Sequence, residues 1–429
     1  MTEVPASIPV PGIADDPHTG PTEKVRGGWV ALISLGSLGL YVGYYGPLQV
    51  LLPEQAQAIA GSADKVAALG WVTALGAVAA MISQPLIGAL SDRTTSRYGR
   101  RHPWILGGAV LAAVALAFLS GQHTIAGMIV GWMLAQFGLN ALQSALNANV
   151  PDRVPVRQRG FASGWISLQQ TLGVVVGVAL VALLVTGVAS GFVAVAVVAG
   201  VFALPFLLFT RSLRLDPADR PPFNWGEFAR AFWVSPRRYP DFAWAWLTRF
   251  LVMLGDAMAI AYLLYFLEDK VHFHQQYPKY TASQGLLLLI LVYAVGVTIS
   301  AVFCGRLSDR IGRRKVLVTI SGLVMALPAL VLAIWPSWWV TVGGALVLGL
   351  GFGAYLAVDL ALVTQVLPSR IGHAKDLGII AIASSGSQVL ASAFAALIVS
   401  NLGYPALFLT VVVLVVLGAV LVWKVRSVP

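Results

Sequence analysis

Charged residues are scarce in this sequence: only 11% are Asp, Glu, Lys or Arg, while 58% are hydrophobic. A soluble globular domain carries about 25% charged residues, and a disordered chain carries few apolar ones, so the composition excludes both. It also excludes a nucleic-acid-binding protein, despite a formal net charge of +10. The composition instead indicates a protein that is embedded in the lipid bilayer.

Cysteine is almost absent. The one cysteine, Cys304, excludes an intramolecular disulfide and any zinc or iron–sulfur site that needs several thiolates. There is no Walker-type GxxxxGK[ST] motif for ATP, and His272 and His274 have no third metal ligand nearby in the sequence. No Ser/His/Asp or Cys/His set converges within one segment. We therefore expect no enzyme activity, no cofactor, no ATP and no metal.

Twelve apolar stretches are long enough to cross a bilayer, which takes about 20 residues of helix. Each is bounded by charged residues, Gly or Pro, and each predicts a transmembrane helix. The twelve lie near 29–52, 66–90, 104–121, 125–149, 160–187, 190–210, 240–267, 282–305, 315–335, 339–367, 377–400 and 404–424. The expected fold class is an all-α membrane protein.

The positions of Lys and Arg support this count, because these residues stay on the cytoplasmic side of short loops. With the N-terminus inside, every Lys and Arg falls in a cytoplasmic segment except Lys65, Lys270 and Lys279 in external loops and Arg249 inside a span. One helix more or fewer would scramble this asymmetry. We expect a multi-pass protein of the cell (inner or cytoplasmic) membrane with both termini in the cytoplasm.

The chain divides into five expected parts. The first is rich in Pro and polar residues and cannot bury a core, which predicts disorder. The parts are a disordered cytoplasmic N-terminus (1–26), a six-helix bundle (27–210), a cytoplasmic linker (211–239), a second six-helix bundle (240–424) and a cytoplasmic tail (425–429).

A short helix is expected within the linker. The segment NWGEFARAF puts Trp225, Phe228 and Phe232 on one helical face, with Asn224 as its N-cap. Such an amphipathic helix would lie on the cytoplasmic membrane interface.

An internal repeat relates the two halves. GALSDR at 88–93 recurs as GRLSDR at 305–310, and Pro151 and Pro368 at the ends of spans four and ten have the same separation. The halves are therefore expected to be parallel repeats, with a solute site at the bilayer midplane between them that opens alternately to each side.

The repeated loop also indicates a family. GALSDRTTSRYGRR at 88–101 resembles the signature loop of the major facilitator superfamily, and GRLSDRIGRRK at 305–315 is a shorter second copy. The first copy continues to Ile105 in a form similar to that of sucrose transporters and the glycoside–pentoside–hexuronide:cation symporters. The superfamily resemblance covers essentially the whole chain. It implies twelve transmembrane helices in two pseudo-symmetric six-helix bundles, and a secondary active transporter.

These loops are interpreted as a gating latch. Asp92 can meet the positive end of a neighbouring helix, while Arg97, Arg100 and Arg101 hold cytoplasmic helix ends together. Such contacts would form in the outward-facing state and break in the inward-facing one; the alternative is that the arginines only fix topology. The latch is expected to comprise Gly88, Asp92, Arg93, Arg97, Gly99, Arg100, Arg101, Gly305, Asp309, Arg310 and Arg313.

The resemblance also bears on the coupling ion. Melibiose-type members carry acidic cation ligands in spans two and four, whereas here neither span has an acid before Asp92 or Asp152 at its cytoplasmic end. Plant sucrose carriers have an Arg in span four, which is absent here. A sodium site of the melibiose type is therefore disfavoured, and a proton is the expected coupling ion.

Three ionisable residues fall well inside predicted spans: Arg249, Asp256 and Asp359. A charge at the bilayer centre costs at least about 3 kcal/mol, so each should face a cavity or a partner. Arg249 and Asp359 lie at similar depth and can pair. We expect the three to form the proton-coupling centre, with Asp256 as the carrier; the alternative is a static pair that holds two helices together.

Span four carries a stripe of uncharged polar residues at helical spacing: Gln136, Asn140, Gln143 and Asn147. Amides that face lipid would be unsatisfied, so the stripe should face either the central cavity or another helix. Amides bind hydroxyls without selecting a charge, which suits a neutral polyol.

Span one carries Tyr41, Tyr44, Tyr45 and Gln49, whose rings can stack on sugar faces or on a drug-like ligand, or pack against span five. Further residues expected to line the site are Gln169, Gln170, Tyr262, Tyr265, Gln284, Tyr355, Ser385 and Gln388.

The sequence thus predicts an alternating-access transporter, proton-coupled, for a small neutral polar solute such as a sugar. The rival is a proton-coupled efflux carrier for amphipathic compounds. A receptor or scaffold is disfavoured by the two latch loops. We expect the carrier to act as a monomer, with the solute, the proton and the lipid bilayer as its partners.

Overall fold

The computed structural model describes residues 24–185, 187–220, 226, 237, 239–311, 314–365 and 373–426, and every regular element in these ranges is a helix. The first half contains α1 (Gly27–Gly46), η1 (Pro47–Leu51), α2 (Leu52–Asp92), α3 (His102–Ser120), α4 (Ile125–Arg153), α5 (Val156–Ala179), η2 (Leu180–Leu184), α6 (Val188–Phe209) and η3 (Pro217–Asp219). The second half contains α8 (Pro240–Ala261), α9 (Leu263–Asp269), α10 (Phe273–Gln276), α11 (Ala282–Ile311), α12 (Arg314–Ile334), α13 (Trp338–Gln365), α14 (His373–Leu421) and η4 (Val422–Lys424).

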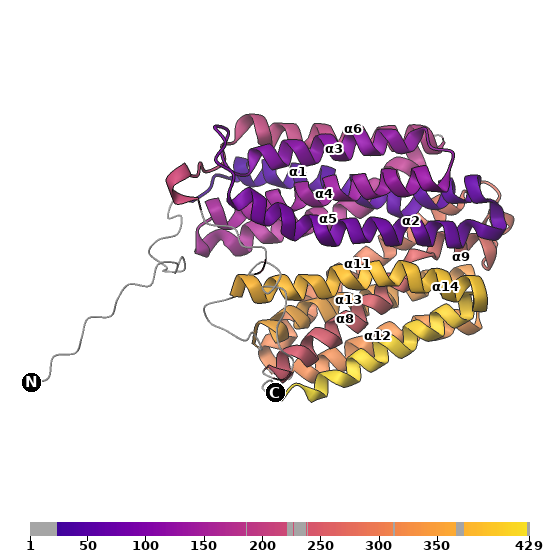
Figure 1. Cartoon of the computed structure of the whole chain (residues 1–429). Coiled ribbons are helices and arrows are strands. Elements are labelled where there is room, and N and C mark those ends of the chain that lie inside the picture. The colour runs from indigo at the N-terminus through magenta and orange to yellow at the C-terminus, as the bar shows by residue number, and fades with distance from the viewer. Residues whose placement is uncertain are drawn as a thin grey trace, which may run out of the picture.

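The helices form two groups. Helices α1 to α6 pack on one another, chiefly α2 and α3 on α4 and α1 on α5 and α6, while α8 packs on α14 and α11 and α12 on α13 (Figure 1). The two groups meet mainly where α2 contacts α14 and where α5 contacts α11. The predicted all-α architecture of two helical bundles is confirmed.

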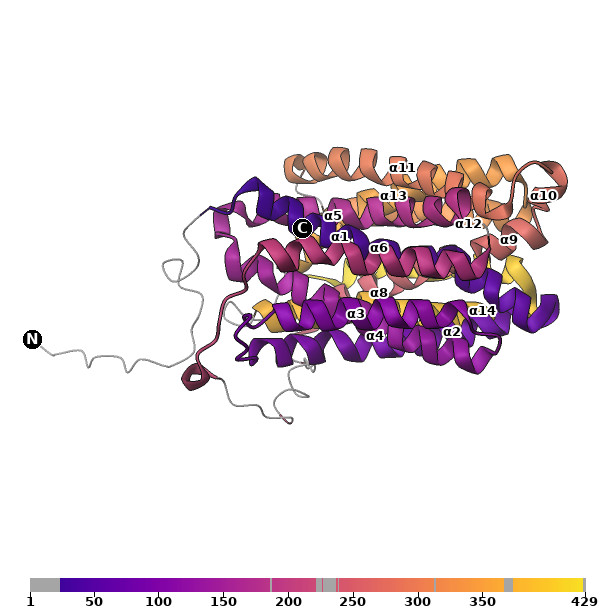
Figure 2. The same ribbon diagram turned by 90° about the horizontal axis from the view of Figure 1, so that it is seen from above.

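The long helices are aligned along one common axis, and they alternate in chain direction (Figures 1 and 2). The first and last described residues, 24 and 426, lie at one end of the molecule, which we call the terminal end, and α9 and α10 lie at the other, which we call the distal end. The predicted disordered N-terminus and amphipathic linker helix fall almost wholly outside the described residues.

Nine helices in the described residues are long and apolar enough to span a membrane, and the difference from the predicted twelve has a simple cause. The first of the nine contains predicted spans one and two, and the last contains span twelve and the second part of span eleven. Span five is represented by the shorter apolar segment Leu168–Leu184. Within the described residues each predicted span is helical over most of its length, and some spans are joined.

The joins are sharp turns at glycine. Gly61 within α2 and Gly403 within α14 have φ values of 74° and 79°, a conformation that other residues adopt only under strain. Span seven is divided instead at Tyr262, whose φ of −117° and ψ of 19° separate α8 from α9. Spans one and five end in the π-helical turns η1 and η2, which contact each other.

The outer surface of the bundles is strongly apolar. Leu184, Phe209 and Ile334 are each more than three-quarters exposed. A surface this apolar would be unstable in water but matches the hydrocarbon of a bilayer. Several polar side chains are instead buried between helices, among them Gln136, Asn140, Asp256 and Asp359.

Candidate functional site

Arg249 on α8 and Asp359 on α13 form the ion pair that their depths in the sequence predicted. Asp359 is only 3% exposed, and its Oδ1 accepts a hydrogen bond of 2.9 Å from the Tyr355 hydroxyl. Both carboxylate oxygens are thus engaged. Tyr355, which was expected to line the solute site, directs its hydroxyl to this pair. Removing one partner of a buried pair costs about 3–5 kcal/mol, because the other charge is left uncompensated.

Asp256 lies seven residues after Arg249 on the same helix, but in a different environment. It is 8% exposed, and its Oδ1 has no hydrogen-bond partner among the described residues. The Tyr293 hydroxyl of α11 lies against the carboxylate, and Tyr45 of α1 interacts with it electrostatically from the other half. Asp256 is therefore a buried acid at the junction of the two bundles, with no cationic partner among the described residues.

The amide stripe of α4 forms a hydrogen-bonded network. Gln84 of α2 donates from Nε2 to Asn140 Oδ1 at 3.1 Å and to Gln143 Oε1 at 2.8 Å. Gln143 donates to the Tyr41 hydroxyl at 3.3 Å, and Asn140 donates to Gln136 Oε1 at 3.0 Å. The network ties α4 to α2 and α1, so the stripe bonds helices together. Gln84 was missed by the sequence analysis, although a polar residue within an apolar span was visible there.

Asn147, the last residue of the predicted stripe, lies outside this network and is exposed. It is one turn beyond Gln143 towards the terminal end of α4. The stripe therefore divides into a bonded part within the bundle and one amide at its edge.

The tyrosines of α1 form an aromatic cluster with a tryptophan of α4. Ring centroids are 5.0 Å apart for Tyr44 and Tyr45, 6.3 Å for Tyr41 and Tyr45, and 6.3 Å for Tyr44 and Trp132. Trp132 is fully buried and its Nε1 has no hydrogen-bond partner among the described residues. Gln170 donates to the Tyr45 hydroxyl at 3.1 Å. Trp132 was not predicted, because a Trp in an apolar span resembles any core residue.

The remaining predicted lining residues differ in position. Gln169 is buried in α5, whereas Gln388 on α14 is exposed, and Gln49 is half-buried in η1. Gln284 donates to the Ala182 carbonyl of η2 at 3.5 Å, which joins the two halves. The side chain of Ser385 lies outside the described residues.

Tyr262 and Tyr265 lie at the distal end and bond to the opposite half. The Tyr265 hydroxyl donates to the Pro53 carbonyl at 2.7 Å, and the Tyr262 hydroxyl to the Val66 carbonyl at 3.4 Å. They were predicted to line the solute site, but these hydroxyls are committed to contacts between the halves. The hydrogen bonds and ion pairs observed between the halves in the described ranges lie at this end.

The first copy of the latch loop is a compact charged cluster within the first half. Arg100 and Arg101 both bond to Asp152 of α4, with closest approaches of 2.5 Å and 3.0 Å. Arg101 also pairs with Asp92 at 2.5 Å and donates to Ser91 at 2.6 Å. Asp92 was expected to meet a helix end, but it meets an arginine of its own loop instead. The neighbours Gly88 and Arg93 are half-buried, and Arg97 is exposed.

The same loop holds the start of the linker. Arg100 N–H donates to the Leu213 carbonyl at 2.9 Å, and Arg101 N–H to the Ser212 hydroxyl at 3.0 Å. Gly99 has a φ of 91°, and a Cβ there would lie 2.5 Å from the Ser212 Cβ. Gly99 is therefore required both for its backbone conformation and for the close passage of the linker.

The second copy of the loop is described only in part. Gly305, Asp309 and Arg310 lie in the last turns of α11, with Arg310 exposed, and the side chain of Asp309 is outside the description. Arg313 falls outside the described residues. In the described parts of the chain no group of three His, Cys, Asp or Glu side chains could hold a metal ion.

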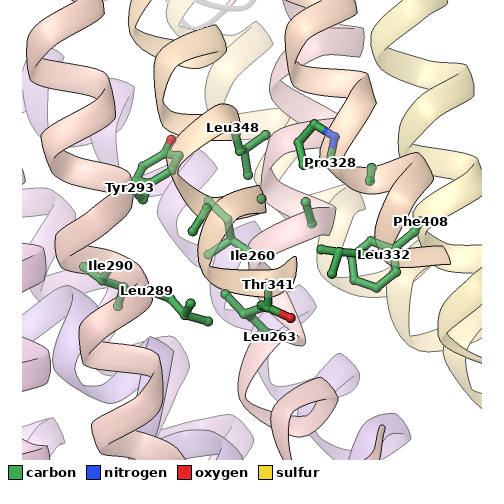
Figure 3. Close-up of a pocket in the computed structure, with 14 residues that line it drawn as sticks. Ile260, Leu263, Leu289, Ile290, Tyr293, Pro328, Leu332, Thr341, Leu348 and Phe408 are labelled. Carbon is green, nitrogen blue, oxygen red and sulfur yellow. The ribbon is translucent and has the colours of Figure 1, made fainter. Parts of the chain in front are cut away.

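A cavity of about 70 Å³ lies inside the second half, between α8, α9, α11, α12, α13 and α14 (Figure 3). Its walls are almost entirely apolar and include Ile260, Leu263, Leu348 and Phe408. Tyr293 contributes its ring to one wall (Figure 3). Because Tyr293 also lies against Asp256, a single residue connects this apolar cavity with the buried acid.

Comparison with known proteins finds a family model and a solved structure that are similar to this chain. A family model described as the Major Facilitator Superfamily matches residues 33–290 and 246–429. A crystal structure of a mutant of the nucleoside transporter NupG superposes with a TM-score of 0.74 at 13% identity, covering 92% of this chain and 99% of that one. At this identity the likeness concerns the fold alone.

Two sequence relatives differ in their named substrates. Sucrose transport protein SUT1 of Oryza sativa subsp. japonica is 28% identical over 175 residues, which are 33% of this chain and 32% of that protein. The match thus spans about a third of the sucrose transporter. Multidrug resistance protein 2 of Bacillus subtilis is 23% identical over 379 residues, covering 83% of this chain and 86% of that protein.

Proposed function

This chain belongs to the Major Facilitator Superfamily, and on that basis we propose that it is a proton-coupled transporter of a small neutral polar solute such as a sugar. The family membership makes it a multi-pass membrane transporter rather than an enzyme. The proposal adds the coupling ion, the class of solute and the residues that serve each.

The observation that carries the proposal is the buried acid Asp256. It lies between the two bundles, which must move against each other during alternating access, and in the described part of the chain it has no cationic neighbour. A charged carboxylate in such a site costs several kcal/mol, whereas the protonated acid costs far less. A rearrangement that brings water to Asp256 allows the proton to leave, and one that removes the water favours its uptake. Asp256 is therefore the proposed proton carrier.

The Arg249–Asp359 pair has a different proposed part. Both Asp359 oxygens are engaged, so the pair is electrically balanced and need not change its protonation. We propose that it holds α8 to α13 and keeps Arg249 from neutralising Asp256. Loss of the pair would free a cation near the proton site.

The solute is proposed to bind on the first half. The tyrosine cluster of α1 supplies faces for a sugar ring, and Trp132 supplies beside Tyr44 an indole donor that no described residue accepts from. The amide network behind them holds these groups in fixed orientations, which lowers the entropic cost of binding. No acid or base in this set selects a charged solute.

The terminal end is proposed to face the cytoplasm. The distribution of Lys and Arg supports this orientation, because nearly all of them lie in segments at that end. The distal end then faces outward, and the contacts between the halves at that end support a conformation closed on the outer side. We propose that the protein acts in the cell membrane as a monomer.

The decisive experiment is counterflow in proteoliposomes with purified protein and a panel of sugars and amphipathic amines, with and without an imposed pH gradient. A sugar should exchange across the membrane, and a pH gradient should drive its accumulation. Asp256→Asn should lose accumulation and keep exchange, while Asp64→Asn, which removes an exposed acid, should behave as the wild type. Undiminished accumulation by Asp256→Asn would refute the coupling assignment.

A second candidate, efflux of amphipathic cations, is favoured by one specific observation. The apolar cavity beside Tyr293 could receive the hydrophobic part of a ligand whose ammonium group meets Asp256. The name of the multidrug relative, whose alignment covers most of both chains, is consistent with this reading. In the same assay an amine, rather than a sugar, would then exchange with protons.

A further inference from the structure

A cluster of charged side chains joins the two halves at the distal end. Its centre is Lys65 of α2, whose side chain is only 5% exposed. Lys65 Nζ lies 2.8 Å from Asp269 Oδ1, 3.4 Å from Glu268 Oε2 and 3.2 Å from Gln57 Oε1. The ammonium also lies 4.4 Å from the centre of the Tyr265 ring. A lysine buried this deeply must be paired, so these contacts fix α9 against α2.

The two acids are bonded unequally. Asp269 accepts from Lys65 with one oxygen and from the Tyr404 hydroxyl with the other, at 2.7 Å. Glu268 has the longer contact with Lys65, and it also interacts with the Gln57 side chain. Asp269 is therefore the principal partner of the lysine, and Glu268 contributes a second negative charge that Lys65 compensates less well.

A third carboxylate adds to the excess of negative charge. Glu54 of α2 accepts a hydrogen bond of 2.6 Å from the Ser283 hydroxyl of α11, and it interacts electrostatically with Glu268. The groups that face Glu268 are thus Lys65 and Glu54 from α2, and Asp269 and Tyr265 from α9; Tyr404 of α14 adds a further hydroxyl. One lysine faces three acids.

Closing this end removes water from Glu268 as well as from Lys65. The Glu268 side chain is 31% exposed in the closed arrangement. Burial raises the pKa of Glu268 above its ordinary value, because the neighbouring Lys65 lowers it by less than the loss of water raises it. The direction of this pKa shift agrees with the excess of three acids over one lysine in the cluster.

We propose that Lys65, Tyr265, Glu268, Asp269 and Tyr404 form a proton-binding outer gate, in which Lys65 and Asp269 lock the halves together and Glu268 takes up a proton as the gate closes. The site binds a proton distinct from the one assigned to Asp256. The inference rests on the proposed orientation of the chain but not on proton coupling at Asp256.

The sign of the pH effect follows by linkage. A group that binds its proton more tightly in the closed gate than in the open one stabilises the closed gate when the exterior is acidic. For one proton, the ratio of closed to open molecules changes by at most about tenfold per pH unit. Acidification on the outer side should therefore close the gate.

The test measures the distance across the outer end by pulsed spin-label spectroscopy in proteoliposomes. Labels are attached at Ser62→Cys on α2 and Asn401→Cys on α14, both exposed, in a Cys304→Ser background that removes the native thiol. Over a pH series from about 4.5 to about 8, the fraction with a short distance should rise as the pH falls. Absence of any pH dependence in the otherwise native chain would overturn the proposal.

Two acid-to-amide variants separate the roles. Glu268→Gln should hold the short distance at every pH, because the amide mimics the protonated acid. Asp269→Asn should lower the closed fraction at least severalfold but keep its dependence on pH. A pH dependence that persists in Glu268→Gln and disappears in Asp256→Asn would overturn the proposal, because the coupling acid would then control the gate.

A lysine comparison tests the lock itself. Lys65→Met should open the outer end, while Lys270→Met, which removes an exposed lysine at the same end, should leave the distances unchanged. Equal effects of the two variants would show that general charge, rather than this cluster, holds the gate, and the lock would be refuted.

Discussion

Adding one methyl group at Gly70 should prevent the outer end from closing. Gly70 of α2 faces Ala396 of α14, and a Cβ at position 70 would lie 2.3 Å from the Ala396 Cβ. Carbon atoms in contact are separated by about 3.5–4.0 Å, so the two helices would have to move apart by about 1.5 Å. Overpacking of this kind costs about 1–3 kcal/mol.

The cost falls only on the closed conformation, because the two helices separate when the outer end opens. A penalty of about 1–3 kcal/mol lowers the ratio of closed to open molecules between about fivefold and about 150-fold. The Ser62→Cys and Asn401→Cys label pair measures this ratio directly for Gly70→Ala. Since every transport cycle includes closure, the rate of solute exchange should fall as well.

Two further variants make the reasoning refutable. Gly70→Ala combined with Ala396→Gly restores the original number of methyl groups and should restore closure. Gly107→Ala on α3, where a new Cβ meets nothing within 4 Å, should have no effect. If the double variant stays open, or if Gly70→Ala closes normally, contact between α2 and α14 does not govern the outer end.

Other predictions concern the centre of the molecule. Asp256→Asn should abolish accumulation driven by a pH gradient while exchange continues, as measured in paired uptake and counterflow assays. Reversing Arg249 or Asp359 alone should destabilise the fold by about 3–5 kcal/mol, and reversing both should recover much of that loss in a thermal unfolding assay; absence of recovery would separate the two residues. Replacing Asn140 and Gln143 by Leu should weaken solute affinity more than expression, and unchanged affinity would assign the network to packing alone.

The membrane-spanning pattern could be predicted from the sequence because hydropathy and the positions of Lys and Arg report directly on transfer into lipid. The depth of a charge along its span was also sufficient to pair Arg249 with Asp359. Both patterns can be read along the chain, because neither depends on how the helices pack on one another.

The sequence did not reveal how each helix is rotated about its own axis or where a helix is broken. The turns at Gly61 and Gly403 fall in the gaps between predicted spans, but hydropathy does not register the break at Tyr262 inside span seven, since its flanking residues remain apolar. The face that a helix presents to its neighbours is equally hidden. Tyr265 could therefore be read as a solute contact, although its hydroxyl bonds to the opposite half.

Contacts between residues of distant helices also could not be predicted from the sequence. Gln84 and Tyr293 became relevant only because their helices pass the amide stripe and Asp256 in three dimensions. Lys65 was read as an external-loop charge, because nothing in its sequence neighbourhood shows that α9 covers it. These contacts are set by the packing of one bundle on the other.

The docking of Ser212 and Leu213 on the signature loop shortens the connection between the bundles. Since the first residues of the linker are fixed to Arg100 and Arg101, they travel as part of the first bundle. The chain after Leu213 then serves as the tether when the two bundles reorient. An insertion or deletion before that residue should disturb the loop, whereas a modest change in length beyond it should leave the swing of the bundles free.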